Sequence, residues 1–207
     1  MPKPEGLVCK REDLIVSPCD NHDANALVEQ EHYLHRKIYI GRNLSYKITH
    51  LQYPTLWGVV MFGYPVFNRK KKLVGKTGPL HNGELVELCR VYLPNEFPTN
   101  TESCAIGACI RYLKRDWKIL TGFKPKAVIS FADTEFTHQG TIYMASNFQY
   151  LGWVRGRKAT PGLGQGRWGG AIKAGAGQKA GERKNVYLLD FSGGQINVEE
   201  LRGTYSQ

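Results

Sequence analysis

The chain has 207 residues, 42% of them apolar and 11% aromatic, which indicates one folded domain and excludes an intrinsically disordered protein. It has no apolar run of about 18 residues, and its first residues, MPKPEGLVCKRED, lack the apolar core of a secretory signal, so we expect a cytoplasmic protein. Five cysteines without a CxxC pair favour buried free thiols over a disulfide framework or a zinc site.

The formal net charge is +10, from 28 Lys and Arg against 18 Asp and Glu. Residues 154–185 contain eight basic side chains and only one acidic one, Glu182, so this segment holds most of the excess. A second basic cluster covers 69–72. A basic excess can serve solubility alone, but its concentration in one segment favours a polyanionic partner, with nucleic acid first.

The first part of the chain predicts an arm followed by two strands. Residues 1–30 are polar and rich in turn-forming residues, so we expect an irregular N-terminal arm. Leu56–Phe67 is nearly all apolar and predicts a buried strand. Leu85–Leu93 alternates between apolar and polar residues and predicts a second strand, antiparallel to the first.

A long amphipathic helix is expected next. Apolar residues recur at steps of three and four from Ala105 to Trp117, which places them on one helical face. Thr99 and Thr101 are the candidate N-caps, because Thr99-x-x-Glu102 has the spacing of a capping box. Gly122 is expected to end the helix.

The second half predicts further strands, a short helix and a long loop. The expected elements, in order, are a buried strand at Ala127–Ala132, a helix at about His138–Phe148, a strand from Tyr150, a mobile basic Gly-rich loop at 154–185, a strand at Asn185–Phe191 and a helical turn at Val198–Leu201. We therefore predict one α/β domain over 1–207, with a mixed sheet and helices on both faces.

Polar side chains gather where the strand Ala127–Ala132 ends. The set comprises Ser130, Asp133, Thr134, Thr137, His138, Thr141 and Tyr143. Ligands of open α/β sheets bind at the carboxyl ends of strands, so this is the candidate site. Each residue also has a structural interpretation: Asp133 as a helix cap, His138 as a structural donor, Tyr143 as core packing.

Two more polar groups are candidates for binding. Arg90 stands among apolar residues in mid-strand, which requires an anionic partner. Glu87 is an odd number of positions away and would lie on the opposite face of a regular strand, leaving Glu102, Asp133 or a substrate as partner. Asn100, Glu102 and Ser103 precede or begin a helix, whose N–H groups either receive an anion or are simply capped.

Two segments together, ELCRVYLPNEFPTNTESCAIGACIRYLKR (87–115) and VISFADTEFTHQGTIYMASNFQYLG (128–152), resemble the Mom family of phage DNA-modification proteins. His32-Tyr33 and the strand WGVVMFG extend the resemblance over roughly 32–152. That family is similar in fold to the Gcn5-related N-acyltransferases. The resemblance implies strands that splay apart near Leu93 and Asp133 to leave a cleft.

The resemblance also implies an activity and a set of roles. Mom proteins place a carbamoylmethyl group on the exocyclic amine of adenine, which protects phage DNA from host restriction, so we expect a transferase acting on double-stranded DNA in the host bacterial cytoplasm. The base would be extruded from the duplex. The expected catalytic residues are Asp133, His138, Tyr143, Arg90 and Ser103. The expected substrate-binding residues are His32, Tyr33, Asn100, Glu102, Ser130 and Asn147. The expected DNA-binding residues are Arg155, Arg157, Lys158, Arg167 and Lys173.

The chain departs from the acyltransferases in one respect. The segment before the first long helix reads PNEFPTNTES and has no glycine, whereas CoA-dependent enzymes wrap the pyrophosphate with a glycine-containing loop there. We therefore doubt CoA as cofactor, and the donor is unknown. A further hypothesis is an iron site formed by His32, His35, Asp133 and His138, which are residue types found in non-haem iron sites.

Two alternatives stay open from the sequence. One is a CoA-dependent N-acyltransferase acting on a small-molecule or protein amine, and the other is a non-catalytic nucleic-acid-binding protein. The sequence does not indicate an oligomeric state.

Overall fold

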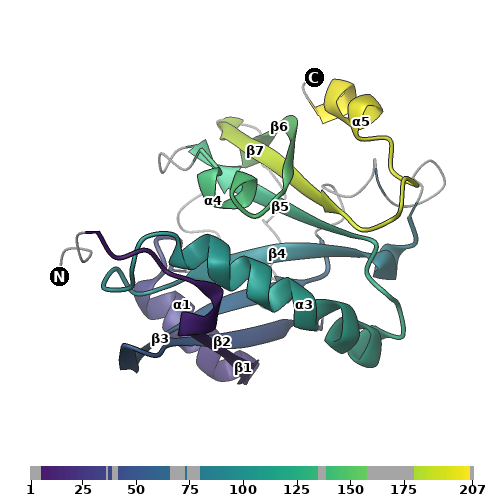
Figure 1. Cartoon of the computed structure of the whole chain (residues 1–207). Coiled ribbons are helices and arrows are strands. Elements are labelled where there is room, and N and C mark those ends of the chain that lie inside the picture. The colour runs from purple at the N-terminus through teal and green to yellow at the C-terminus, as the bar shows by residue number, and fades with distance from the viewer. Residues whose placement is uncertain are drawn as a thin grey trace.

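The computed structural model describes residues 6–35, 37–38, 42–65, 73, 80–134, 139–157 and 180–205. These residues form a seven-stranded mixed sheet with the strand order β1-β2-β3-β4-β5-β7-β6 (Figure 1). The strands are β1 (Leu14–Cys19), β2 (Leu44–His50), β3 (Tyr53–Gly63), β4 (Leu85–Tyr92), β5 (Ala127–Asp133), β6 (Gln149–Arg157) and β7 (Ala180–Asp190). The helices are η1 (Arg11–Asp13), α1 (Asn21–Glu31), η2 (Asn82–Glu84), α3 (Thr101–Thr121), α4 (Thr141–Met144) and α5 (Val198–Tyr205). In this part of the chain, no helix combines the length and apolarity needed to span a bilayer.

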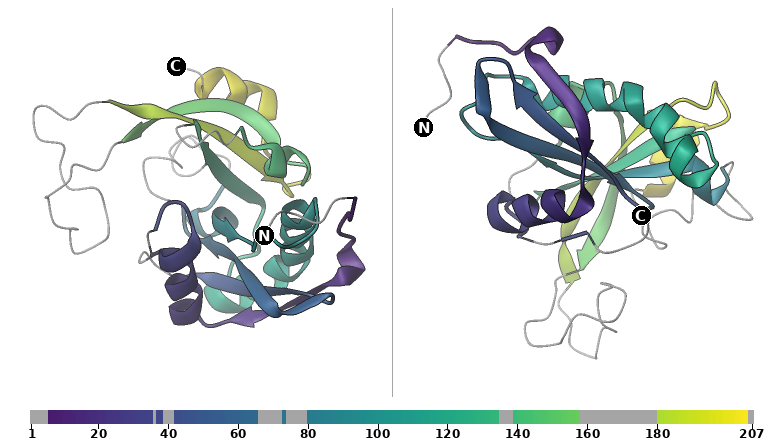
Figure 2. Two further views of the ribbon diagram at one scale, coloured as in Figure 1. Left: turned by 90° about the vertical axis from the view of Figure 1, so that its left-hand side faces the viewer. Right: turned by 90° about the horizontal axis from the view of Figure 1, so that it is seen from below.

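Helices cover both faces of the sheet, as predicted. Alternate residues of β3 point to opposite sides: Val59 and Met61 pack with Ala24 and Val28 of α1, whereas Phe62 belongs to the cluster under α3. Figure 2 shows α1 and α3 on either side of these strands. The last helix, α5, packs on β6 and β7 through a separate apolar cluster.

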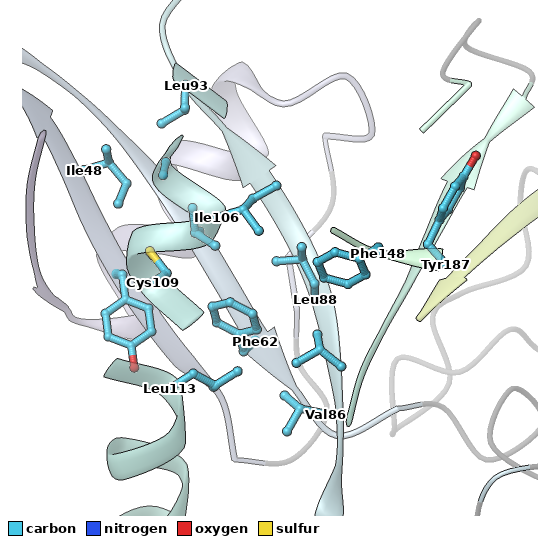
Figure 3. Packing of buried hydrophobic residues seen from close by; sticks show 14 of the residues in the cluster. Ile48, Phe62, Val86, Leu88, Leu93, Ile106, Cys109, Leu113, Phe148 and Tyr187 are labelled. Carbon is cyan, nitrogen blue, oxygen red and sulfur yellow. The ribbon is translucent and has the colours of Figure 1, made fainter. Parts of the chain in front are cut away.

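The long helix α3 supplies the main core. Its apolar stripe buries Ala105, Cys109, Leu113 and Trp117 completely against β2, β3 and β4 (Figure 3). Each large buried side chain contributes about 1.5–3 kcal/mol through loss of apolar surface to water. The helix ends at Gly122, whose φ of +83° is the left-handed conformation common after a helix.

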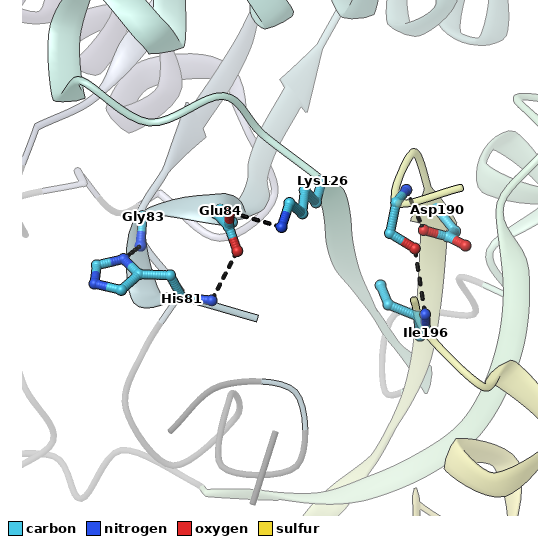
Figure 4. A network of polar contacts seen from close by, with 7 residues as sticks. His81, Gly83, Glu84, Lys126, Asp190 and Ile196 are labelled. Atoms are coloured by element: carbon cyan, nitrogen blue, oxygen red, sulfur yellow. Dashed lines mark hydrogen bonds and ion pairs between the residues drawn. The ribbon is translucent and has the colours of Figure 1, made fainter. Parts of the chain in front are cut away.

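One end of the β4–β5 pair is fastened by a polar network, drawn in Figure 4. Lys126 forms an ion pair with Glu84 at 2.9 Å, and the same carboxylate accepts the His81 amide at 2.9 Å. The Lys126 amide also donates to the Glu84 carbonyl at 2.7 Å. This network joins the residues that immediately precede two parallel strands, so the strands start side by side.

The predicted irregular arm at 1–30 is wrong beyond its first residues. Leu14–Cys19 is the edge strand β1, paired antiparallel with β2, and Asn21–Glu31 is α1. The Asp20 carboxylate accepts the His22 amide at 2.7 Å and so caps this helix. What appeared to be a cluster of turn residues is therefore the beginning of a helix.

Three further boundaries differ from the predictions. The N-cap of α3 is Asn100, with φ of +68° and no side-chain cap, so the capping box from Thr99 is not formed. The helix predicted at 138–148 is only α4, because Gly140 has a φ of +75° and starts it late. Of the predicted loop at 154–185, residues 154–157 belong to β6 and 180–185 belong to β7, and the residues between them lie outside the described part of the chain.

Candidate functional site

The candidate site lies where β4 and β5 part. Their parallel pairing runs from Leu85↔Ala127 to Leu88↔Ser130 and then stops. Beyond this point β4 stays paired with β3, and β5 stays paired with β7 as far as Asp133. The Ser130 hydroxyl donates to the Leu88 carbonyl at 3.1 Å and marks the last contact before the strands separate. The predicted splaying is confirmed.

A β-bulge in β4 brings two charged residues to one face. Phe62 pairs with Leu88 and Met61 pairs with Arg90, so Cys89 is an extra residue. In a regular strand, residues three positions apart point to opposite faces. The extra residue in the bulge turns position 90 to the same face as position 87. Glu87 and Arg90 therefore lie on the same face, and both act on the pKa of Tyr143. The expectation of opposite faces, which assumed a regular strand, is wrong.

Asp133, the last residue of β5, forms an ion pair with Lys184. The Lys184 Nζ lies 2.5 Å from the Asp133 carboxylate, and the two residues stand opposite each other in the β5–β7 ladder. The two side chains are only 21% and 11% exposed. An ammonium at this distance attracts the carboxylate electrostatically. Sequence reasoning placed Lys184 in the basic loop and missed this role.

Tyr33 reaches the same place from the turn after α1. Burial raises the pKa of Tyr33 to about 12, with further increases from Tyr143 and Asp133 and an opposing effect of Arg90. These electrostatic effects indicate that Tyr33 lies near Tyr143, Asp133 and Arg90, all of which the sequence analysis had selected. The neighbouring His32 ring stacks on Tyr33 with centroids 4.3 Å apart and is itself buried.

Tyr143, on α4, completes this group. Burial raises the pKa of Tyr143, while a hydrogen bond with Ser130 lowers it in part. Its ring lies 5.3 Å from that of Tyr187, whose hydroxyl donates to the Gln139 carbonyl at 2.5 Å. Because its pKa is raised above 10, the Tyr143 hydroxyl is protonated at neutral pH and serves as a hydrogen-bond donor. We refer to Tyr33, Arg90, Ser130, Asp133, Tyr143 and Lys184 as the strand-end cluster.

Other predicted residues occupy the start of α3 and the turn after α4. Asn100, Glu102 and Ser103 lie in the first turn of α3, where the Ser103 hydroxyl donates to the Asn100 carbonyl at 3.0 Å. Asn147 has a φ of +64° in the turn between α4 and β6. The turn before α3 is closed by its own backbone, since the Phe97 amide donates to Pro94 at 3.1 Å.

The predicted DNA-binding segment is described only at its two ends. Arg155 and Arg183 are register partners in the β6–β7 ladder. The Arg183 guanidinium lies 4.1 Å from the centroid of the Trp153 ring. Arg157 is the last residue of β6. Lys158, Arg167 and Lys173 lie outside the described residues, as does His138.

Among the described residues, the predicted metal ligands do not form a group close enough to share an ion. His32, His35 and Asp133 are absent from the two sets of described side chains close enough to share an ion. The His35 ring instead contacts the Glu29 carbonyl at 2.9 Å. The first set of three joins Cys9, Asp13 and His50, which the sequence did not suggest.

The mixed sheet, with its two parallel neighbours parting after a bulge, has the fold of the Gcn5-related acetyltransferases. A single-residue variant of spermidine N-acetyltransferase from Vibrio cholerae superposes with a TM-score of 0.50 at 10% identity, over 91% of this chain and 99% of that one. Spermidine N-acetyltransferase from the same organism, in complex with CoA and spermine, gives a TM-score of 0.49 at 9% identity, over 87% and 97% of the two chains.

The sequence defines the family within this fold. The Mom protein family matches residues 13–185, and the chain belongs to that family. Methylcarbamoylase mom of Escherichia phage Mu is 29% identical over 157 residues, which is 75% of this chain. The chain covers 55% of that relative's length.

Proposed function

We propose that this protein is a phage DNA-modifying transferase that places a carbamoylmethyl group on the exocyclic amine of adenine. The observation that supports it most is the strand-end cluster, an acid, two phenols and an arginine at the parting strands of an acyltransferase fold. Membership of the Mom family and the name of the phage Mu relative, a methylcarbamoylase, support the group transferred. Action in the bacterial cytoplasm during infection belongs to the same proposal.

The amine of adenine is a weak nucleophile, so the site must accept a proton and activate the donor. In the proposed reaction the amine nitrogen attacks the methylene carbon of the donor, and the bond between this carbon and its leaving group breaks. The amine proton passes to the Asp133 carboxylate. The leaving group departs with the electron pair and takes a proton from Tyr143 or Tyr33, whose raised pKa values keep them protonated.

Charge around Asp133 and the leaving group is balanced by two cations. Lys184 holds the carboxylate toward the end of β5, which fixes its direction. Arg90, on the same side of the parting strands, supplies positive charge where an anionic leaving group or donor would form. His138 stays a predicted base outside the described residues.

We propose that the donor is not CoA. The segment 93–100 contains no glycine, and two of its turns are closed by Phe97 donating to Pro94 and Thr101 donating to Pro98. Those amides are engaged with carbonyls and do not form the phosphate cradle that CoA needs. A calorimetric titration with CoA tests this point, and micromolar binding would favour the alternative of a CoA-dependent N-acyltransferase.

Double-stranded DNA is the proposed acceptor. Arg183 and the arginines of β6 stand on the strands that lead into the basic segment, so phosphates would lie along this edge of the sheet. Adenine would then be flipped toward Asp133 and the phenols. A non-catalytic DNA-binding protein would need the same basic strands but not the ion pair at the end of β5.

The test is mass spectrometry of nucleosides from a bacterium that expresses the full chain. We expect a modified deoxyadenosine heavier by one carbamoylmethyl group, and its loss with Asp133→Asn. Asp23→Asn, at an exposed aspartate of α1, is the matched control and should leave the modification unchanged. Unmodified adenine from folded wild-type protein in phage-infected cells, where the donor is present, would refute the proposal.

A further inference from the structure

A second cluster of reactive side chains lies away from the strand-end cluster. Cys9, Asp13 and His50 each offer a ligand atom, and the three atoms lie within 4.8 Å of one another. Cys9 comes from the N-terminal segment, Asp13 from the end of η1 and His50 from the last residue of β2. Cys9 is 4% exposed and His50 is 1% exposed, so the cluster is largely removed from water.

His50 supplies the observation that points to a ligand. Its Nδ1 accepts the Gln52 amide at 3.2 Å, whereas its buried Nε2 has no hydrogen-bond partner among the described residues. A buried polar atom without a partner costs about 1–3 kcal/mol.

The carboxylate and thiol are oriented in a compatible way. One oxygen of Asp13 accepts the Lys10 amide at 2.8 Å, which holds the carboxylate and leaves its other oxygen for a ligand. The Cys9 thiol donates to the Lys10 carbonyl at 3.2 Å, a weak bond that a metal ion readily replaces. Both contacts fix the turn before β1 in the position from which the donors converge.

Cys104 of α3 is a candidate fourth donor that lies beside Cys9 but outside the set of three grouped ligand atoms. The Cys104 thiol donates to the Cys9 carbonyl at 3.4 Å and is close enough to form a hydrogen bond with the Cys9 thiol. Two sulfurs, one imidazole and one carboxylate make a tetrahedral set of the kind that zinc prefers. Donor atoms around a tetrahedral zinc ion are about 3.5 Å apart. Side-chain rotations that move the three grouped donor atoms by about 1 Å would bring them to this separation.

We propose that Cys9, Asp13, His50 and Cys104 bind one Zn²⁺ ion as a structural site. The site joins the N-terminal segment to β2 and to the first turn of α3. Ligands that far apart in sequence close long loops, so the ion stabilises the fold much as a cross-link does. The sequence-based preference for free thiols over a zinc site followed from the lack of a CxxC pair, because these ligands are adjacent only in the folded chain.

Cobalt titration tests the site directly, since Co²⁺ bound by thiolate has a charge-transfer band in the near ultraviolet. The full chain is reduced, freed of metal with a chelator and titrated with Co²⁺. We expect one equivalent to bind with a thiolate band, and Zn²⁺ to displace it. Cys9→Ser and His50→Gln should each weaken Co²⁺ binding at least 100-fold. Cys104→Ser should remove about half of the band, and an unchanged band would exclude Cys104.

Two controls keep the test independent of folding. Cys19→Ser changes a thiol outside the cluster and should keep the full band. His22→Gln changes the exposed group formed with Asp20 and Asp23 and should also leave it unchanged. Zinc should raise the melting temperature of the wild-type protein by at least 5 °C, and coordination through Nε2 should shift the Gln52 amide resonance. Folded wild-type protein that binds no Co²⁺ would overturn the proposal, even if a variant fails to fold.

Discussion

Replacing Lys184 with methionine tests the ion pair at the end of β5. Methionine keeps most of the length and the apolar stem of lysine but removes its charge. The whole residue Asp133 is 7% exposed, and in this variant it would stay buried without the ammonium that now lies 2.5 Å from its carboxylate. Removing one partner of a buried pair is costly because the other charge has already lost its hydration.

The size of the effect follows from distance and burial. At 2.5 Å, the Coulomb attraction between unit charges is about 1.7 kcal/mol in water and about 7 kcal/mol at an effective dielectric constant of 20. The Lys184 side chain is 21% exposed and that of Asp133 is 11% exposed, so the pair lies between these limits. Desolvation and ordering of the lysine side chain reduce the net value, and we expect a loss of about 2–3 kcal/mol.

Urea denaturation followed by circular dichroism measures this loss at neutral pH. Wild type, Lys184→Met, Asp133→Asn and the double variant form a double-mutant cycle, which isolates the coupling between the two side chains. The matched control is Lys37→Met. Its partner Glu29 is 51% exposed, and loss of that pair should cost at most about 0.5 kcal/mol. A coupling below about 0.5 kcal/mol between Asp133 and Lys184 would refute the reasoning.

Three further predictions concern alkaline pH, a glycine and DNA. Burial raises the pKa of Tyr205 to about 12, so the folded chain keeps a proton that the unfolded chain loses near pH 10. Stability should therefore fall by about 2–3 kcal/mol from pH 10 to pH 12, and by less in Tyr205→Phe, as measured by urea midpoints. Gly140→Ala places a Cβ 2.3 Å from the Tyr187 ring at a φ of +75°, and calorimetry should show a loss above about 2 kcal/mol. Gly193→Ala, at a φ of +69° in open space, should cost only about 1 kcal/mol. Affinity for duplex DNA should fall steeply with salt, and Arg183→Gln should reduce the slope of log K against log salt by about 1 in fluorescence anisotropy; an unchanged slope would exclude a phosphate contact.

The sequence predicted those elements whose pattern is long and regular. The apolar stripe of α3 and the continuous apolar run of β5 leave one interpretation each, and the antiparallel pair β3–β4 followed from one apolar run and one alternating segment. The site was found for the same reason. Polar residues that follow a buried strand stand out against it, which is why Ser130, Asp133 and Tyr143 were selected before their contacts were known.

The N-terminal third was misjudged because its elements depend on tertiary pairing. β1 contains Pro18 and only six residues, and it is a strand because β2 supplies its hydrogen-bond partners. β2 itself was overlooked, although LSYKITH alternates between apolar and polar residues. Short strands with half-buried faces are weakly specified by their own residues.

The charge pairs depend on register, which a single sequence does not reveal. The bulge at Cys89 moves Arg90 to the face of Glu87, and the residue types at 87–90 do not predict a bulge. Lys184 faces Asp133 only because β7 runs antiparallel to β5 with that particular alignment. Fifty-one positions separate the pair, so no local pattern joins them.

The end of the β4–β5 ladder has a consequence for how such sequences can change over time. Beyond Leu88 and Ser130, the facing edges of two interior strands present main-chain groups that do not pair with each other. Main-chain N–H and C=O groups are the same in every residue except proline. A molecule held between these edges would be recognised without regard to side-chain identity at positions such as 91 and 131. Positions whose side chains take no part in the chemistry, such as 91 and 131, can therefore vary while the binding geometry is kept, with proline as the residue type that is selected against.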